Sequence, residues 1–172
     1  MMAMTRPIWV TGLMLGMALL PMSWAASVCS VHDGDTFRLC YGPSIRLWGV
    51  DAPELSQPYG QQSKQALEKL LSQKNVNLTC ANTSYKRWVC LVEVDNKNVN
   101  YERVRQGMAY AEPHYSSNTF KEVEGTAKDS MLGIWSQPDG GEKPWEYRHR
   151  VKQADKEEDP TMGYDKPSSL DR

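Results

Sequence analysis

The stretch SIRLWGVDAPE, residues 44–54, decides the fold expected of this chain. Ile45 and Leu47 fall on one face of the stretch and Arg46 falls on the other, which is the two-residue period of a β-strand with one buried face. Pro53 cannot donate a hydrogen bond to a neighbouring strand. The strand is therefore expected to end just before this proline.

Charged residues gather where this strand ends. Arg46, Asp51 and Glu54 lie within nine residues of one another, and Asp35 follows the Asp-Gly turn signal of the preceding hairpin. Such charges are either solvated side chains of a surface loop or the groups of a functional site. Carboxylates without nearby His or thiol groups suit Ca²⁺ or Mg²⁺ rather than zinc. With Arg87 in a later hairpin, two arginines beside such a cation would match the demands of a phosphodiester, which needs planar donors and positive charge.

The rest of the chain combines short strands with helices. One hairpin is expected around the Asp-Gly turn and another around residues 82–87, while helices are predicted over about Tyr59–Ser72 and Val99–Gln106. Thr119 opens a capping box that predicts a third helix, with Met131 on its apolar face. Strand-like runs cover residues 27–31, 36–41, 44–50, 76–80 and 88–94.

This order of elements predicts an α+β fold that is mainly β. Five strands with a helix between the third and the fourth suit a five-stranded Greek-key barrel of the OB type with about three α-helices. An SH3-like barrel would usually lack that intervening helix. OB barrels often bind oligonucleotides, but a fold alone does not establish a function.

All four cysteines, Cys29, Cys40, Cys80 and Cys90, follow the apolar N-terminal run. An even number of cysteines in an exported chain favours disulfides, and three pairings are possible. Because each neighbouring pair flanks one predicted hairpin turn, we predict Cys29–Cys40 and Cys80–Cys90 bridges. Free buried cysteines are the alternative. A zinc site is disfavoured because there is no C-x-x-C motif and the histidines are scattered.

Both ends of the chain are predicted to lie outside the folded domain, which covers residues 26–150. Residues 1–25 have a basic start, an apolar run and a Ser-Trp-Ala ending, which are typical of a secretory signal peptide. The alternative is a membrane anchor, but Pro21 interrupts a run that is shorter than the roughly 20 residues a span needs. Residues 151–172 are polar without an apolar period and are expected to form a disordered tail.

These features predict an exported protein, in a periplasm or in the surrounding medium, with no membrane span after cleavage. The whole chain carries 20 Lys and Arg against 21 Asp and Glu, so net charge gives no hint of a polyanionic partner. Any attraction to nucleic acid must come from local clusters or from a bound cation.

Five motifs resemble the staphylococcal (micrococcal) nuclease, or thermonuclease, family. They are VHDGDTFRL, IRLWGVDAPE, YKRW, VNYERVRQGMAYAEPHY and GIW, in the order of that family and over roughly Val28–Trp135. A further motif, PWEYR, resembles a C-terminal element of bacterial members. The resemblance implies an OB-fold nuclease domain and Ca²⁺-dependent hydrolysis of DNA and RNA that leaves 3′-phosphate ends. We also expect a monomer.

The resemblance implies a metal site. Asp35 and Asp51 would bind Ca²⁺ directly, and the backbone carbonyl of Ala52 would be a further ligand. The best-known member has threonine at the position of Ala52. Because only the carbonyl is needed there, the side chain is dispensable.

The resemblance also implies catalytic roles. Glu54 would be the general base that acts on a water, and Arg46 and Arg87 would bind the scissile phosphate. Tyr85 would contact the nucleotide, and Tyr115 lies near the base-stacking tyrosines of the family. Lys86 stands where the family has a glycine, and the hairpin loop is shorter than in the family. Both differences affect the direction in which the Arg87 side chain points.

The alternative is a non-catalytic OB-fold module that binds single-stranded nucleic acid. Degenerate domains of that kind typically lose the carboxylates or the arginines, whereas this chain keeps both sets. Arg103 is expected on the exposed part of the second helix, outside the site.

Overall fold

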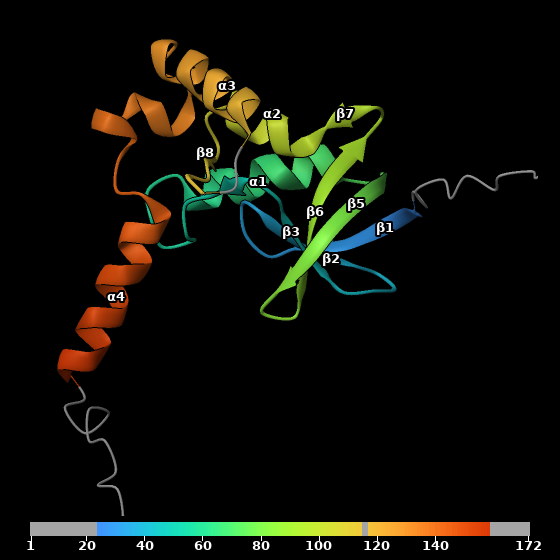
Figure 1. Ribbon diagram of the computed structural model, residues 1–172, viewed down its shortest axis with the longest axis horizontal. Helices are drawn as coiled ribbons and strands as arrows, with labels where there is room; N and C mark the ends of the chain where they lie inside the picture. Colours follow the sequence, from blue (N-terminus) through green and yellow to red (C-terminus); the bar gives the residue numbers. More distant parts are fainter. Residues whose placement is uncertain (1–23, 115–116, 159–172) are drawn as a thin grey trace, which may run out of the picture.

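The computed structural model describes residues 24–114 and 117–158, and its centre is a closed β-barrel (Figure 1). Each strand of the ring pairs antiparallel with its neighbours, except that β3 pairs in parallel with β6 and so closes the ring. This confirms the predicted OB-type, mainly β fold. The ring strands are β1 (Trp24–Val31), β2 (Thr36–Leu39), β3 (Ser44–Leu47), β5 (Asn75–Ser84) and β6 (Arg87–Val94).

Helices and shorter strands surround the barrel. β4 (Val50–Asp51) pairs with β8 (Tyr110–Ala111), and β7 (Lys97–Asn98) pairs with β6. Within the described residues there are four α-helices, one more than predicted, and α4 extends away from the others (Figure 1). They are α1 (Gly60–Leu71), α2 (Val99–Arg105), α3 (Asn118–Asp129) and α4 (Pro144–Glu158); 3₁₀ turns follow α3 at Gly133–Ser136 and Pro138–Gly140.

The main core fills the barrel and continues under α1 and α2. Strand alternation explains it, because Ile45 and Leu47 are fully or almost fully buried while Arg46 between them stays partly exposed. Leu67 of α1 and Val104 of α2 close the same cluster. The core thus fixes the positions of the strands, including β3 with its partly exposed Arg46.

A smaller apolar cluster lies beside the barrel and supports the start of α4. Tyr110, Ile134 and Trp135 are buried in it, and Trp145 of α4 packs against it. The ring of Trp145 meets the ring of Tyr110 edge-on, at 5.9 Å between centroids. This contact determines where α4 leaves the body of the protein.

Both predicted disulfides are present. Cys29–Cys40 joins β1 to the residue after β2, and Cys80–Cys90 joins β5 to β6. No free cysteine remains in the part of the chain that the structure describes.

The second hairpin turn is tighter than predicted. Only Tyr85 and Lys86 form it, with φ angles of 49° and 66°, so residues 82–84 belong to β5. A two-residue turn with both φ angles positive usually carries Asn-Gly or a similar pair. Because Tyr-Lys lacks that signature, the sequence suggested a longer loop.

The third helix also begins and ends earlier than predicted. Ser117, not Thr119, is the N-cap residue, and its side chain accepts a hydrogen bond from the backbone N–H of Phe120. α3 ends at Asp129, so Met131 lies beyond the helix and is 70% exposed rather than part of an apolar face.

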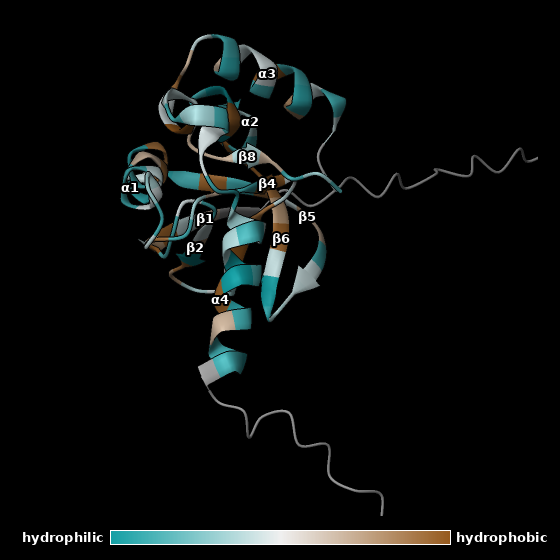
Figure 2. Cartoon of the chain, turned by 90° about the vertical axis from the view of Figure 1, so that its left-hand side faces the viewer, coloured by the Kyte–Doolittle hydropathy of each residue, from teal (hydrophilic) through white to brown (hydrophobic). Residues whose placement is uncertain are grey.

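The folded part extends further at its C-terminal end than residues 26–150. α4 continues to Glu158, eight residues into the predicted tail. Residues 151–158 are mostly good helix formers, and they extend a helix that begins with Pro144 at a position where proline is well tolerated. A polar helix needs no apolar period, so hydrophobic patterning missed it. Figure 2 shows its largely hydrophilic surface.

The outer segments carry predictions that the structure leaves untested. Most of the predicted signal peptide and residues 159–172 lie outside the described residues, whereas Trp24 and Ala25 pair with β5. Among the helices within residues 24–114 and 117–158, none is long and apolar enough to cross a membrane.

Candidate active site at the edge of the barrel

The turn between β1 and β2 presents Asp35 to the site. The Asp33 side chain accepts a hydrogen bond from the backbone N–H of Asp35 at 3.0 Å, as in an Asx turn. A Cβ atom on Gly34 would lie 2.0 Å from Ser63 Oγ, so only glycine allows this close approach to α1. The backbone carbonyl of Asp35 also accepts a 2.9 Å hydrogen bond from the N–H of Leu47, which ties the turn to β3.

Arg46 bridges the two buried aspartates. Its Nη1 donates to Asp35 Oδ1 at 2.7 Å and its Nη2 donates to Asp51 Oδ1 at 2.8 Å. Pairing of β2 with β3 places Arg46 opposite Thr36, and β4 brings Asp51 to the same edge. The backbone N–H of Ala52 donates to the remaining oxygen of Asp35 at 3.0 Å.

Burial dominates the electrostatics of this cluster. Asp35 is only 3% exposed, and burial raises its pKa to about 7 against the lowering effect of Arg46. Burial also lowers the pKa of Arg46, but Asp35 and Asp51 outweigh it and the pKa lies above its ordinary value. Arg46 therefore offsets the cost of burying the Asp35 carboxylate only in part.

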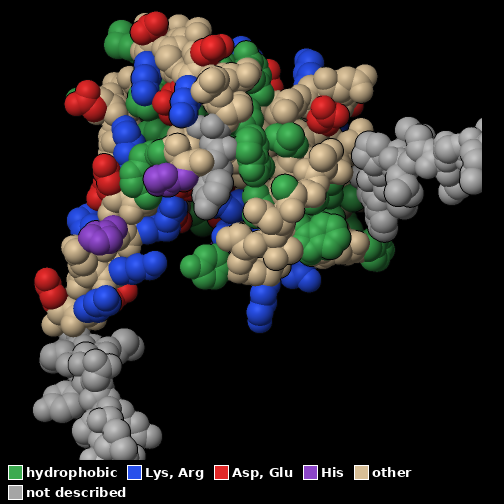
Figure 3. Space-filling model, in the orientation of Figure 1, with side chains coloured by type: hydrophobic (Ala, Val, Ile, Leu, Met, Phe, Trp, Pro, Cys, Tyr) green, Lys and Arg blue, Asp and Glu red, His purple; other side chains and the backbone are tan. Residues whose placement is uncertain are grey.

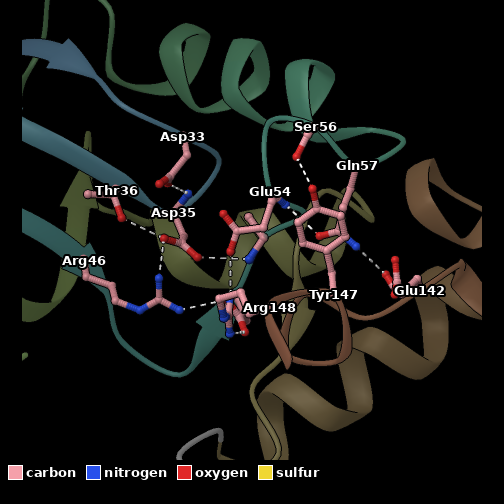
Figure 4. Close-up of polar contacts among 12 residues, drawn as sticks. Asp33, Asp35, Thr36, Arg46, Glu54, Ser56, Gln57, Glu142, Tyr147 and Arg148 are labelled. Carbon is pink, nitrogen blue, oxygen red and sulfur yellow. Dashed lines mark hydrogen bonds and ion pairs between the residues drawn. The ribbon is translucent and has the colours of Figure 1, made fainter. Parts of the chain in front are cut away.

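The loop that follows β4 holds Glu54 at the rim. Its backbone N–H donates to Gln57 Oε1 at 2.9 Å, and the Gln57 amide donates to the carbonyl of Glu142 at 2.9 Å (Figure 4). A Cβ atom on Gly60 would lie 2.0 Å from the Glu54 carbonyl oxygen. The start of α1 therefore packs directly against this loop and fixes its path.

The β5–β6 hairpin brings the second arginine. Arg87 Nη1 donates to Thr36 Oγ1 at 3.3 Å, and Thr36 Oγ1 in turn donates to Asp35 Oδ1 at 2.8 Å. Its Nε is buried and donates to no residue that the structure describes. Tyr85, in the adjoining turn, is 91% exposed. One arginine face is thus unpaired close to the carboxylates, with an aromatic ring beside it.

A third arginine comes from α4. Arg148 Nη2 donates to Asp51 Oδ2 at 2.6 Å, and Nη1 donates to Glu54 Oε1 at 2.7 Å (Figure 4). These hydrogen bonds, the stronger one to Asp51, hold the pKa of Arg148 above its ordinary value. The residue before it, Tyr147, shares a 2.6 Å hydrogen bond with Ser56, so α4 is tied to the loop that carries Glu54.

These side chains surround one cavity of about 350 Å³. The structure brings together every residue predicted for catalysis and metal binding, and Tyr85 lies at the rim. Tyr115 falls outside the described residues. Eleven residues line the cavity: Asp33, Asp35, Arg46, Ala52, Pro53, Glu54, Ser84, Tyr85, Arg87, Arg148 and Lys152.

Sequence reasoning missed three contributors to this site. Thr36 links Arg87 to Asp35, and Gln57 holds the Glu54 loop, but neither residue type stands out in a strand or a loop. Arg148 did have a signal, because it is the last residue of the PWEYR motif. The motif itself gave no indication of where the helix would place it.

Arg103 corrects a further prediction. It was expected on the exposed part of α2, but it is fully buried, and its guanidinium donates to the Gly34 carbonyl at 3.2 Å and the Ser63 carbonyl at 2.7 Å. Its spacing from Val99 and Asn100, which are also buried, is that of one helix face and could have revealed this. Burial lowers the pKa of Arg103 to about 10.

The donor set fits a hard divalent cation. Asp35 and Asp51 offer only oxygen atoms, and both side chains are buried. Within the described residues no three His, Cys, Asp or Glu side chains form a ready metal cluster. A cation here would therefore take two carboxylates and complete its shell with backbone carbonyl oxygen, such as that of Ala52, and water.

Comparison with known proteins gives a consistent picture. The model of the family described as "Staphylococcal nuclease homologue" matches residues 44–137. An "Uncharacterized endonuclease" of Haemophilus influenzae is 34% identical over 134 residues, which cover 74% of this chain and 75% of that protein. A "Micrococcal nuclease" of Shigella flexneri is 30% identical over 151 residues, which cover 77% of this chain and 86% of that protein. The family match includes Arg46, Asp51, Glu54 and Arg87 but ends before Arg148.

Proposed function

This chain belongs to the staphylococcal nuclease family and is a nuclease, and from that premise we propose that it is an exported, calcium-dependent endonuclease. It would hydrolyse phosphodiester bonds of DNA and RNA and leave 3′-phosphate ends. The observation that carries the proposal is the Asp35–Arg46–Asp51 bridge, of which Asp35 and Arg46 line one cavity together with Glu54 and Arg87.

The roles of the side chains follow from their places in the cavity. Glu54, at the rim, takes a proton from the attacking water, whose oxygen bonds to phosphorus as the bond to the 5′ oxygen breaks. Arg46 and Arg87 donate to the non-bridging phosphate oxygens, on which negative charge develops. Arg87 Nη1 makes only a long, 3.3 Å hydrogen bond to Thr36, so this guanidinium can turn toward a phosphate oxygen at little cost.

Asp35, Asp51 and the Ala52 carbonyl would hold the cation. When bound, Ca²⁺ would polarise a phosphate oxygen and balance carboxylates that otherwise repel a polyanion. A mixed set of carboxylate, backbone carbonyl and water oxygens suits the flexible coordination of Ca²⁺ better than the strict octahedron of Mg²⁺.

The remaining features support export and a nucleic-acid partner. Two disulfides are typical of an oxidising compartment, and the N-terminal sequence has the form of a signal peptide. Tyr85 at the rim would contact a nucleotide, and we assign the same task to Tyr115. The protein would act as a monomer, in a periplasm or in the surrounding medium.

The test is digestion of DNA and RNA by the purified mature chain, with the product ends identified by mass spectrometry. We expect cleavage within both substrates in Ca²⁺, little in Mg²⁺, none after chelation, and 3′-phosphate ends. Equal turnover in Mg²⁺ would rule out the calcium assignment. Tight binding of single strands without cleavage in any divalent metal would instead favour a non-catalytic module.

A further inference from the structure

Arg148 contacts two carboxylates to which the proposed function gives different tasks. Its Nη2 donates to Asp51 Oδ2 at 2.6 Å, and its Nη1 donates to Asp51 Oδ1 at 3.2 Å and to Glu54 Oε1 at 2.7 Å. One guanidinium therefore covers both oxygens of the proposed metal ligand and one oxygen of the proposed base.

The proposed chemistry needs those same oxygens. Asp51 accepts one hydrogen bond from Arg46 and two from Arg148. A cation that binds this carboxylate would come close to both guanidinium groups, so like-charge repulsion favours the withdrawal of one arginine. Both arginines bridge two carboxylates, but the side chain of Arg46 is 20% exposed and belongs to a barrel strand, whereas the side chain of Arg148 is 39% exposed. Arg148 is therefore the partner that can leave at the lower cost.

The construction of α4 allows this movement. Trp145 and Tyr147 anchor its first turns to the body, and from Lys152 onward its described side chains are exposed. Figure 3 shows Lys and Arg side chains along the same helix, beside the barrel. Arg148 thus projects from a helix that is fixed at one end, with solvent next to its guanidinium.

We propose that Arg148 is a built-in counter-ion for the metal-free site, which neutralises Asp51 and Glu54 until a divalent cation binds and displaces it. The inference rests on the proposed function for the identity of the cation. Cation binding and the Arg148 contacts then exclude each other, so each weakens the other by the same factor. Departure of the arginine also frees the Glu54 oxygen that must accept a proton from water.

Calcium titration by calorimetry tests the exclusion directly. In the full mature chain, Arg148→Gln should bind Ca²⁺ about tenfold more tightly than the unchanged protein, because a charge-assisted contact that opposes binding is gone and partial exposure moderates the gain. Arg150→Gln is the matched control. Arg150 lies two residues further along α4 and does not line the cavity. Among the described residues it hydrogen-bonds only Glu142 and lies over the ring of Tyr147, so calcium affinity should not change.

Hydrogen exchange of the unchanged protein gives a second readout that needs no variant. Adding Ca²⁺ should speed amide exchange over Tyr147–Lys152 several-fold, and the increase should be absent in Arg148→Gln. Equal or weaker calcium binding by folded Arg148→Gln, or unchanged exchange in the unchanged protein, would overturn the proposal. The failures are separable, since tighter calcium binding by Arg148→Gln together with no cleavage of nucleic acid by the unchanged protein would refute the proposed function alone.

Discussion

Two arginine clusters flank the turn that carries Asp35, and they differ in what the arginines contact. On the side of α1 and α2, Arg103 is fully buried and donates to the carbonyls of Gly34 and Ser63. On the cavity side, Arg46 and Arg148 donate to carboxylates and remain partly exposed. We call the buried contacts of Arg103 with backbone carbonyls the closed cluster. We call the partly exposed contacts of Arg46 and Arg148 with carboxylates, together with the other side chains of the cavity, the open cluster.

The difference separates architecture from chemistry. Backbone carbonyls occupy fixed places, so an arginine that joins them holds the turn in one position. Carboxylates in an open cavity can exchange one cation for another, so arginines there share their partners with a metal or a phosphate. Loss of Arg103 should therefore lower stability, whereas loss of the side chains in the open cavity should lower turnover.

The largest effect is expected in the open cluster, at Glu54. Glu54→Gln keeps the size of the side chain but removes the basic oxygen, so turnover should fall by about 10²–10⁴-fold. Calcium affinity measured by calorimetry should change much less, because Glu54 is not among the proposed ligands. Near-normal turnover in the folded, calcium-bound variant would show that another group activates the water.

Arg87 should give the next largest effect. Arg87→Lys keeps the positive charge but loses the planar fork, so we expect turnover to fall by about ten- to a hundredfold in steady-state assays on DNA. Substrate affinity should fall less, because the hydrogen bonds of the planar fork reach full strength only as charge develops on the phosphate. A rise in the Michaelis constant with unchanged turnover would place Arg87 in ground-state binding instead.

Arg103 tests the closed cluster. Arg103→Lys cannot reach the Gly34 and Ser63 carbonyls together, and each buried carbonyl left without a donor costs roughly 1–3 kcal/mol, so the free energy of unfolding should fall by about 2 kcal/mol. Urea denaturation measures this. Turnover of the remaining folded protein should change by less than about threefold. A large loss of turnover at unchanged stability would erase the distinction between the clusters.

The open cluster was predictable from sequence wherever its residues are joined by local pairing. Asp35 directly precedes β2, Arg46 lies on β3, and the pairing of Thr36 with Arg46 follows once the hairpin of these two strands is recognised. Asp51 and Glu54 follow on the next few residues. Short-range strand patterns, together with the order of the strands in the barrel, therefore predict most of the site.

The remaining parts depend on contacts between distant segments. Arg148 meets Asp51 across 97 residues, and its position depends on how Trp145 packs outside the barrel. Arg103 meets Gly34 across 69 residues. Polarity alone suggested that Arg103 is solvated, because a charge is normally excluded from a core unless the fold offers acceptors. Those acceptors become visible only when the packing of α1 against α2 and the Asp35 turn is known.

The smallest effect is expected at Arg105, two residues from Arg103 on α2. Arg105 points outward with its side chain 53% exposed and pairs with Glu102 at 2.8 Å, one helical turn away. Such exposed pairs contribute little, because water screens the charges and ordering two long side chains costs entropy. Arg105→Lys should therefore change the free energy of unfolding by less than about 0.5 kcal/mol in the same urea experiment and leave turnover unchanged. Since the helix and the substitution are the same, the contrast with Arg103→Lys isolates the buried carbonyl contacts. If both variants lost stability equally, the loss would belong to α2 as a whole, and the closed cluster would not be what holds the Asp35 turn.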